Sequence, residues 1–218
     1  MSWRILAPTA NASPRVEWAV FEGMSVFSEA ARGVIGSATE GSAVVLSSRP
    51  EWEPENDGAQ ILPTWMGAAA RLRPELPSLL ESLAAVGRSR GVEVLLLPEL
   101  GGVISDVPSI LSLGRELAGK SAGLIVEPAA LLTPSMVERV HEHLTRLYSV
   151  STYLASVRAI VCSDVVRTGE EATMPVAAGA GAAGPLLREL VENARGGHAG
   201  EGGGGWQGRW VLDGAWPW

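Results

Sequence analysis

Four short apolar runs in the second half of the chain each lead into a carboxylate residue. Buried parallel strands have this continuous hydrophobic character, and α/β folds gather their chemistry at the carboxyl ends of such strands. Segments with helical periodicity separate the runs, which predicts strands and helices alternating around a parallel sheet. The acids that follow the runs are Glu99, Glu127, Asp164 and Asp213. We therefore expect four carboxylates at one edge of the sheet. There they could bind a metal or share acid–base work, although each could also simply cap a following turn.

The apolar and periodic segments predict the order of the elements along the chain. Strands are expected at 3–7, 43–46, 92–97, 123–126, 158–162 and 209–212, with a seventh short strand near 60–62. Helices are expected at 15–34, 76–91 and 107–117, in a long segment opened by Thr133 and Pro134, and at 185–194. This alternation fits either a TIM-type (β/α) barrel or a doubly wound open sheet. Six to seven strands fall short of the eight in a full TIM barrel, so a barrel would be incomplete or distorted.

Size and charge narrow the classes of protein that remain. The 218 residues are enough for one large domain, 1–218. A net charge of −7 without a basic stripe argues against nucleic acid as a partner. No apolar run approaches the ~20 residues of a membrane helix, and the first residues lack the apolar core of a signal peptide. With Cys162 as the single cysteine, no internal disulfide can form, and a cytoplasmic location is expected.

Two glycine-rich segments lie late in the chain. Residues 196–205 contain seven glycines and are expected to form a mobile loop before the last strand. Residues 179–184 spell G-x-G-x-x-G ahead of a helix, a pattern with which dinucleotide sites bring a pyrophosphate to a helix N-terminus. Such a site needs an acid about 20 residues further on, at the end of the next strand, and the nearest strand-end acid, Asp213, lies farther away. A loop that binds a phosphate or a hydroxyl fits this position better.

Histidine and cysteine chemistry has little support in the sequence. His141 and His143 are two positions apart on a helix and cannot face one metal together. Cys162 has no identifiable base near it and is expected to be a buried structural residue. Trp210, beside Asp213, belongs to a C-terminal group of tryptophans that could form the floor of a ligand site or simply pack.

The second half of the chain resembles the xylose isomerase-like TIM barrels, the sugar-phosphate isomerases and epimerases related to endonuclease IV. The likeness rests on the segments 91–99, 123–128, 175–181 and 206–213 and extends over about residues 75–215. In that family, ligands at strand ends hold a divalent metal that polarises a sugar carbonyl. The family's H-x-K-D segment corresponds to 161–164, where Val161 replaces the histidine and Ser163 the lysine, while Asp164 is retained.

The resemblance implies roles for individual residues. Glu99, Glu127 and Asp213 would be the metal ligands or acid–base groups, and without the histidine their oxygen donors would favour Mg²⁺ or Mn²⁺. The residues implied to contact substrate are Asp164, Gly179, Gly181 and Trp210.

Three functional hypotheses follow. The first is an isomerase or epimerase-like protein that acts on or binds a small polyhydroxylated or carbonyl compound. The second is a catalytically inactive relative that serves as a binding or interaction protein, and a homodimer would cover its open strand edges. The third is a nucleotide-binding α/β protein that uses residues 179–184.

Overall fold

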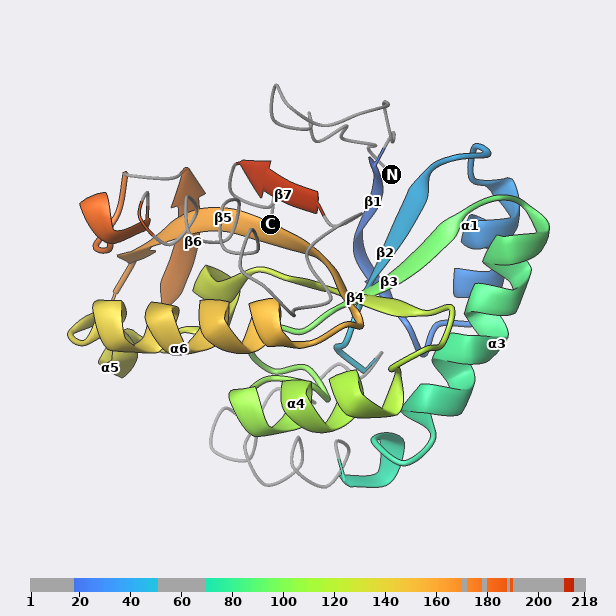
Figure 1. Ribbon diagram of the computed structural model, residues 1–218, viewed down its shortest axis with the longest axis horizontal. Coiled ribbons are helices and arrows are strands. Elements are labelled where there is room, and N and C mark those ends of the chain that lie inside the picture. The colour runs from blue at the N-terminus through green and yellow to red at the C-terminus, as the bar shows by residue number, and fades with distance from the viewer. Residues whose placement is uncertain are drawn as a thin grey trace, which may run out of the picture.

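A curled, mainly parallel sheet with helices along its outer side forms the centre of the molecule (Figure 1). The computed structural model describes residues 18–50, 70–169, 172–177, 180–187, 189 and 210–213. Side chains are described from residue 24 onward within these ranges, apart from residues 177 and 210–213. The predicted strands at 3–7 and 60–62, the glycine-rich loop 196–205 and Gly179 lie outside the described residues.

The strands follow one another across the sheet in the order of the sequence. β1 (Trp18–Ser25), β2 (Ala43–Ser47), β3 (Glu93–Leu97), β4 (Gly123–Val126) and β5 (Val157–Arg167) are parallel neighbours. β7 (Trp210–Asp213) pairs in parallel with the first half of β5, and β6 (Thr173–Ala177) pairs antiparallel with its second half. Within the described residues β1 and β7 do not pair with each other, so the sheet stays open.

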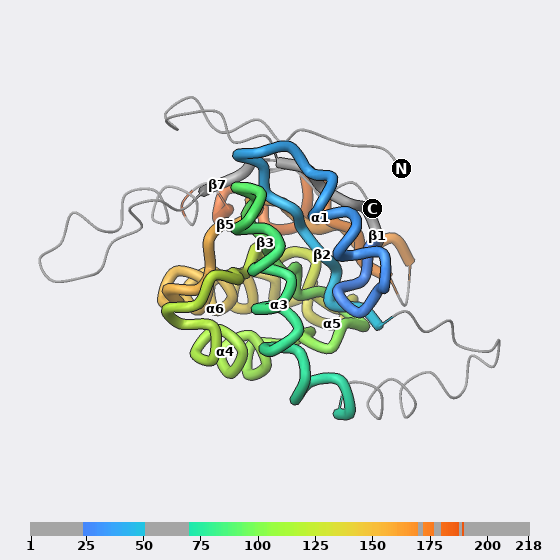
Figure 2. Tube along the Cα trace, turned by 90° about the vertical axis from the view of Figure 1, so that its right-hand side faces the viewer, coloured from blue at the N-terminus to red at the C-terminus, as the bar shows by residue number. Residues whose placement is uncertain are grey.

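The helices pack on the convex side of this sheet and follow its curvature (Figure 2). They are α1 (Ala31–Ser37), α3 (Leu76–Ser89), α4 (Val107–Glu116), η1 (Pro128–Leu131), α5 (Pro134–Val137) and α6 (Val140–Tyr153). A doubly wound sheet would reverse its strand order and carry helices on both faces, whereas this order never reverses. The architecture is therefore that of a partial TIM-type barrel. None of the helices in the described ranges is long and apolar enough to cross a membrane.

The two faces of the sheet carry separate cores, because successive strand residues point to opposite sides. The convex face packs Leu46, Leu96 and Ile160 against the helices. The concave face gathers a smaller cluster in which every side chain is at most 3% exposed. Its members are Ala43, Val45, Leu95, Leu97, Ile125, Ala159 and Val161.

Local signals explain why the best-predicted helices begin and end where they do. In α3 the buried side chains of Leu76, Leu80 and Leu83 recur at helical spacing. α4 begins at a capping box, in which the Asp106 carboxylate accepts a hydrogen bond from Ser109 N at 2.8 Å.

Replacing Asp106 with alanine should lower the free energy of unfolding by about 1 kcal/mol, because one N–H group at the start of α4 loses its acceptor. Urea denaturation of wild type and Asp106→Ala measures this difference. No change in stability would mean that solvent caps the helix equally well.

The structure corrects the predicted helix at 15–34. Residues 18–25 form β1, and only Ala31–Ser37 are helical. Trp18, Val20 and Phe21 favour extended backbone, and β2 offers a row of main-chain partners from Ala43 to Ser47. Pairing with β2 thus outweighed the local helical pattern.

Two further predictions needed correction. The helix opened by Thr133 is broken near Arg139, which separates α5 from α6, and Thr133 makes no side-chain cap. Residues 173–177, where no strand was expected, form β6 as the return arm of a hairpin with β5. The strands expected at 43–46, 92–97, 123–126 and 209–212 are confirmed to within one residue at each end.

Candidate functional site

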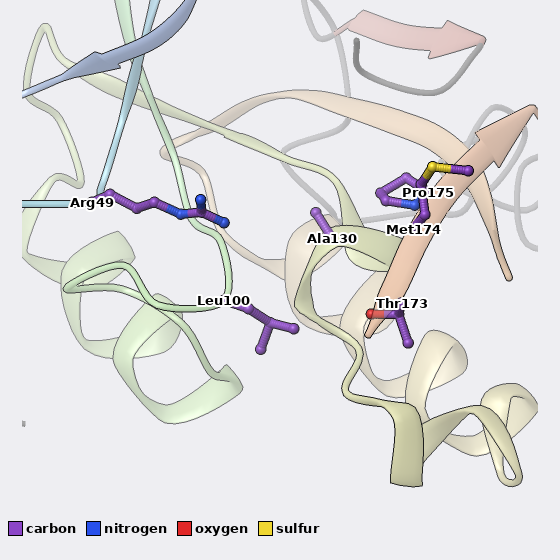
Figure 3. Close-up of a pocket in the computed structure, with 6 residues that line it drawn as sticks. All are labelled: Arg49, Leu100, Ala130, Thr173, Met174 and Pro175. Atoms are coloured by element: carbon purple, nitrogen blue, oxygen red, sulfur yellow. The ribbon is translucent and has the colours of Figure 1, made fainter. Parts of the chain in front are cut away.

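A pocket of about 250 Å³ opens at the carboxyl ends of the strands (Figure 3). We call it the mouth pocket. Each part of its wall follows a different strand or belongs to the β5–β6 hairpin, so the curl of the sheet brings the wall together. The lining residues are Arg49, Leu100, Ala130, Thr173, Met174 and Pro175.

Behind this pocket, Glu99 is held by two residues from the end of β2. The Ser47 hydroxyl donates to Glu99 Oε1, and Arg49 Nε lies 3.0 Å from Glu99 Oε2. The Glu99 side chain is only 3% exposed, whereas that of Arg49 is 56% exposed. The buried Glu99 carboxylate therefore fixes the Nε end of the Arg49 guanidinium, and this guanidinium reaches the pocket.

The loop after β3 places Glu99 by folding back onto β2. Glu99 N donates to the Ile104 carbonyl at 3.0 Å, and Val103 N donates to the Ser48 carbonyl at 2.8 Å. Gly102 permits this contact, because a Cβ at position 102 would collide with the Ser48 hydroxyl and lie 3.0 Å from the Glu99 carbonyl.

Burial raises the pKa of Glu99 above its ordinary value of 4.5. The hydrogen bond from Ser47 and the charge of Arg49 offset part of that rise. Folding therefore makes the Glu99 carboxyl a weaker acid.

Because the folded chain holds this proton more tightly, Glu99 contributes most to stability below pH ~4.5 and loses that contribution as the pH rises through its raised pKa. The stability of Glu99→Gln relative to wild type should therefore increase with pH. Glu116→Gln should show the opposite slope, since the hydrogen bond from Arg73 lowers the pKa of Glu116. Urea denaturation across the acid-to-neutral range measures both, and equal slopes would contradict the prediction.

Asp164 lies on the convex face of β5, whereas Glu99 lies at the concave mouth. The loop at 180–184 encloses the Asp164 side chain. Asp164 Oδ1 accepts hydrogen bonds from Val165 N at 2.7 Å and Ala183 N at 2.9 Å. Asp164 Oδ2 accepts from Gly181 N and Gly184 N, each at 3.0 Å. Four main-chain donors thus converge on one fully buried carboxylate. The predicted role of Asp164 in substrate binding stays a prediction, and what the structure gives it is an anchoring role.

This arrangement bears on the G-x-G-x-x-G segment. The loop does bind an anion through its N–H groups, as such loops do, but the anion is the chain's own carboxylate. A Cβ at Gly181 would collide with the Val165 carbonyl and lie 2.6 Å from Asp164 Oδ1. The donors that a phosphate would need in the described part of the loop are therefore already engaged.

Glu127 is fully buried at the end of β4. Burial raises the pKa of Tyr148 well above its ordinary value, and its neighbours Cys162, Glu127 and Asp164 raise it further. The Tyr148 side chain is buried on α6 beside Cys162. A buried polar cluster therefore lies between β4, β5 and α6, and Glu127 belongs to it.

Asp213 and Trp210 are placed by backbone register alone. The Cα of Asp213 pairs with that of Cys162, and the Cα of Trp210 with that of Ala159. Their side chains lie outside the described residues, so their predicted roles at the site stay predictions.

The described side chains do not form a set of donors for a divalent metal. Among the described residues, no three side chains of His, Cys, Asp or Glu lie close enough to hold an ion. Glu99 is engaged by Ser47 and Arg49, and Asp164 by the loop. The predicted Mg²⁺ or Mn²⁺ site therefore depends on Asp213 and stays a prediction.

Sequence reasoning missed Arg49, the charged residue of the pocket. Arg49 follows the apolar strand 43–47, and functional residues of α/β folds lie just after the carboxyl ends of strands. The four acids were chosen on the same ground. A search of strand ends for cations as well as carboxylates would have found it.

Comparison with known proteins adds one distant structural likeness. No protein-family model and no curated protein matches the chain. A xylose isomerase domain protein from Planctomyces limnophilus superposes with a TM-score of 0.38 at 17% identity, over 68% of this chain and 48% of that one. The chain thus spans about half the length of that protein. Such a remote likeness carries no argument about function, and membership of the xylose isomerase-like superfamily stays a prediction.

Proposed function

We propose that the chain binds a small carbonyl or polyhydroxylated compound in the mouth pocket. The observation that carries this proposal is the Arg49 guanidinium, held at its base by the buried Glu99 and half-exposed to a pocket at the carboxyl ends of the strands. Ligands of α/β folds bind at this end of the sheet.

The energetics of the pair support a role in binding. Burying a carboxylate costs free energy that one ion pair rarely returns in full, so such a pair is poor evidence of a stabilising device. A guanidinium fixed at one edge, however, loses little entropy when it binds a ligand oxygen at the other. The arrangement thus suits recognition better than stability.

A ligand screen tests this function. Wild type is titrated with aldoses, ketoses, polyols and 2-oxo acids, with thermal shift as the first readout and calorimetry as the second. A hit should bind Arg49→Ala at least about tenfold more weakly, the usual cost of a lost charge-assisted contact. Arg139→Ala is the matched control, since Arg139 is 69% exposed and also paired with a glutamate. No hit, or a hit that Arg49→Ala binds equally well, would contradict the proposal.

A second candidate is proton transfer beside a carbonyl, as in an isomerase or epimerase. The raised pKa of Glu99 and its contact with Arg49 favour it, because a carboxyl of this kind can exchange a proton while a guanidinium polarises a carbonyl oxygen. Bound ketoses or 2-oxo acids should then exchange the hydrogens next to the carbonyl in D₂O, detected by proton NMR. Binding without exchange would favour the catalytically inactive relative.

A further inference from the structure

We propose that the ligand of the mouth pocket is a small carboxylate with a short apolar body, whose acid group binds the outer edge of the Arg49 guanidinium. This inference rests on the proposed function, and within its ligand classes it favours carbonyl compounds that carry a carboxylate, such as 2-oxo acids, over polyols.

The lining of the pocket is unevenly divided between polar and apolar groups. Arg49 supplies the charge, and the other described polar side chain is that of Thr173, whose hydroxyl donates to the Leu132 carbonyl at 2.6 Å. The remaining described wall consists of Leu100, Ala130, Met174 and Pro175. A polyol would leave most of its hydroxyl groups facing apolar surface, which costs free energy.

The Arg49 guanidinium is positioned to bind a ligand carboxylate in addition to that of Glu99. It has five N–H donors in a plane, and the ion pair with Glu99 is made through Nε. Among the described residues the terminal Nη1 and Nη2 atoms of Arg49 have no other ion-pair partner. Figure 3 shows the guanidinium extending into the space between Leu100 and Ala130, with β6 across from it. A ligand carboxylate fits this outer edge by a bidentate contact.

The volume of the pocket and its apolar rim favour a ligand with a short apolar body. A volume of about 250 Å³ lies below the range of pockets for drug-sized ligands, so the occupant is small. Met174 is 45% exposed at the rim and offers a pliable apolar contact for a carbon chain.

The test compares probes of nearly equal shape. Butyrate and 2-oxobutyrate carry the acid group, butyramide is the neutral counterpart of butyrate, and xylitol and inorganic phosphate represent the competing ligand classes. Binding is followed by NMR titration of wild type, Arg49→Gln, Arg49→Lys and Arg139→Gln at millimolar probe concentrations.

We expect the carboxylates to bind at least about tenfold more tightly than butyramide, and Arg49→Gln to abolish that preference. Arg49→Lys should retain part of the preference, because it keeps the charge without the planar fork. Arg139→Gln should behave like wild type.

Equal affinity for butyrate and butyramide, or tighter binding of xylitol or phosphate, would overturn the carboxylate assignment. Xylitol bound through Arg49 would leave the proposed function intact, so the two failures can be told apart. If none of the probes bound, the carboxylate assignment would fail, and the wider ligand screen would then decide the proposed function.

Discussion

Replacing Asp164 with alanine is expected to lower the free energy of unfolding by about 3–5 kcal/mol, the largest effect of any single substitution that we predict. The reason is the convergence of four main-chain N–H groups on its two oxygens. Removing the carboxylate leaves Ala183 N without its acceptor in a buried position and releases the loop at 180–184 from β5. Chemical denaturation with urea measures the change.

Two variants keep this prediction falsifiable if Asp164→Ala does not fold. Asp164→Asn retains one acceptor oxygen and should cost about half as much. Asp106→Ala removes a carboxylate that accepts from one helix N-terminus and should cost only about 1 kcal/mol. Equal losses for Asp106→Ala and Asp164→Ala would show that Asp164 is no more than an ordinary cap.

Replacing Gly181 with alanine is expected to cost about 3 kcal/mol. The new Cβ would collide with the Val165 carbonyl and lie 2.6 Å from Asp164 Oδ1, and neither neighbour can move without breaking the hydrogen bonds around Asp164. Gly33→Ala in α1 is the control, because nothing lies within 4 Å of a Cβ there. That substitution should be neutral or stabilising, as alanine is the better helix former.

A double-mutant cycle tests whether Gly181 and Asp164 act together. Once Asp164→Asn has loosened the loop, the alanine at 181 should cost less than it does in wild type. Strictly additive losses would contradict the close packing of the loop around the carboxylate.

The inner parallel strands β2, β3 and β4 were predictable because they are buried on both faces. The runs ending at Leu97 and Val126 are apolar throughout, and such runs depend little on distant partners. β1 and β6 depend on their partners, and the sequence alone could not identify them. β1 is defined by pairing with β2, and β6 by the extension of β5 beyond residue 162.

The candidate site was predictable only in part, since a strand-end acid can fall on either face. Glu99 lies with Ser47 at the concave mouth, as expected. Asp164 is one residue beyond Ser163, and that single step turns it to the convex face, where the loop encloses it. The apolar runs carry no information about this parity, because buried strands do not alternate.

The strand-end acids have different roles and do not act as four equivalent carboxylates. Asp164 anchors a loop, Glu127 belongs to a buried cluster with Tyr148, and Glu99 holds Arg49. The group that meets a ligand is therefore expected to be a cation.

The most direct test of this account is an NMR titration of protein labelled with ¹³C at the methionine methyl groups. Met174 lies on the wall of the mouth pocket, so its methyl signal reports on that site. We predict that 2-oxobutyrate shifts the Met174 signal more than any other methionine signal, and that Arg49→Gln abolishes the shift. A shift centred on another methionine, or an unchanged response in Arg49→Gln, would contradict the assignment of the ligand site to the mouth pocket.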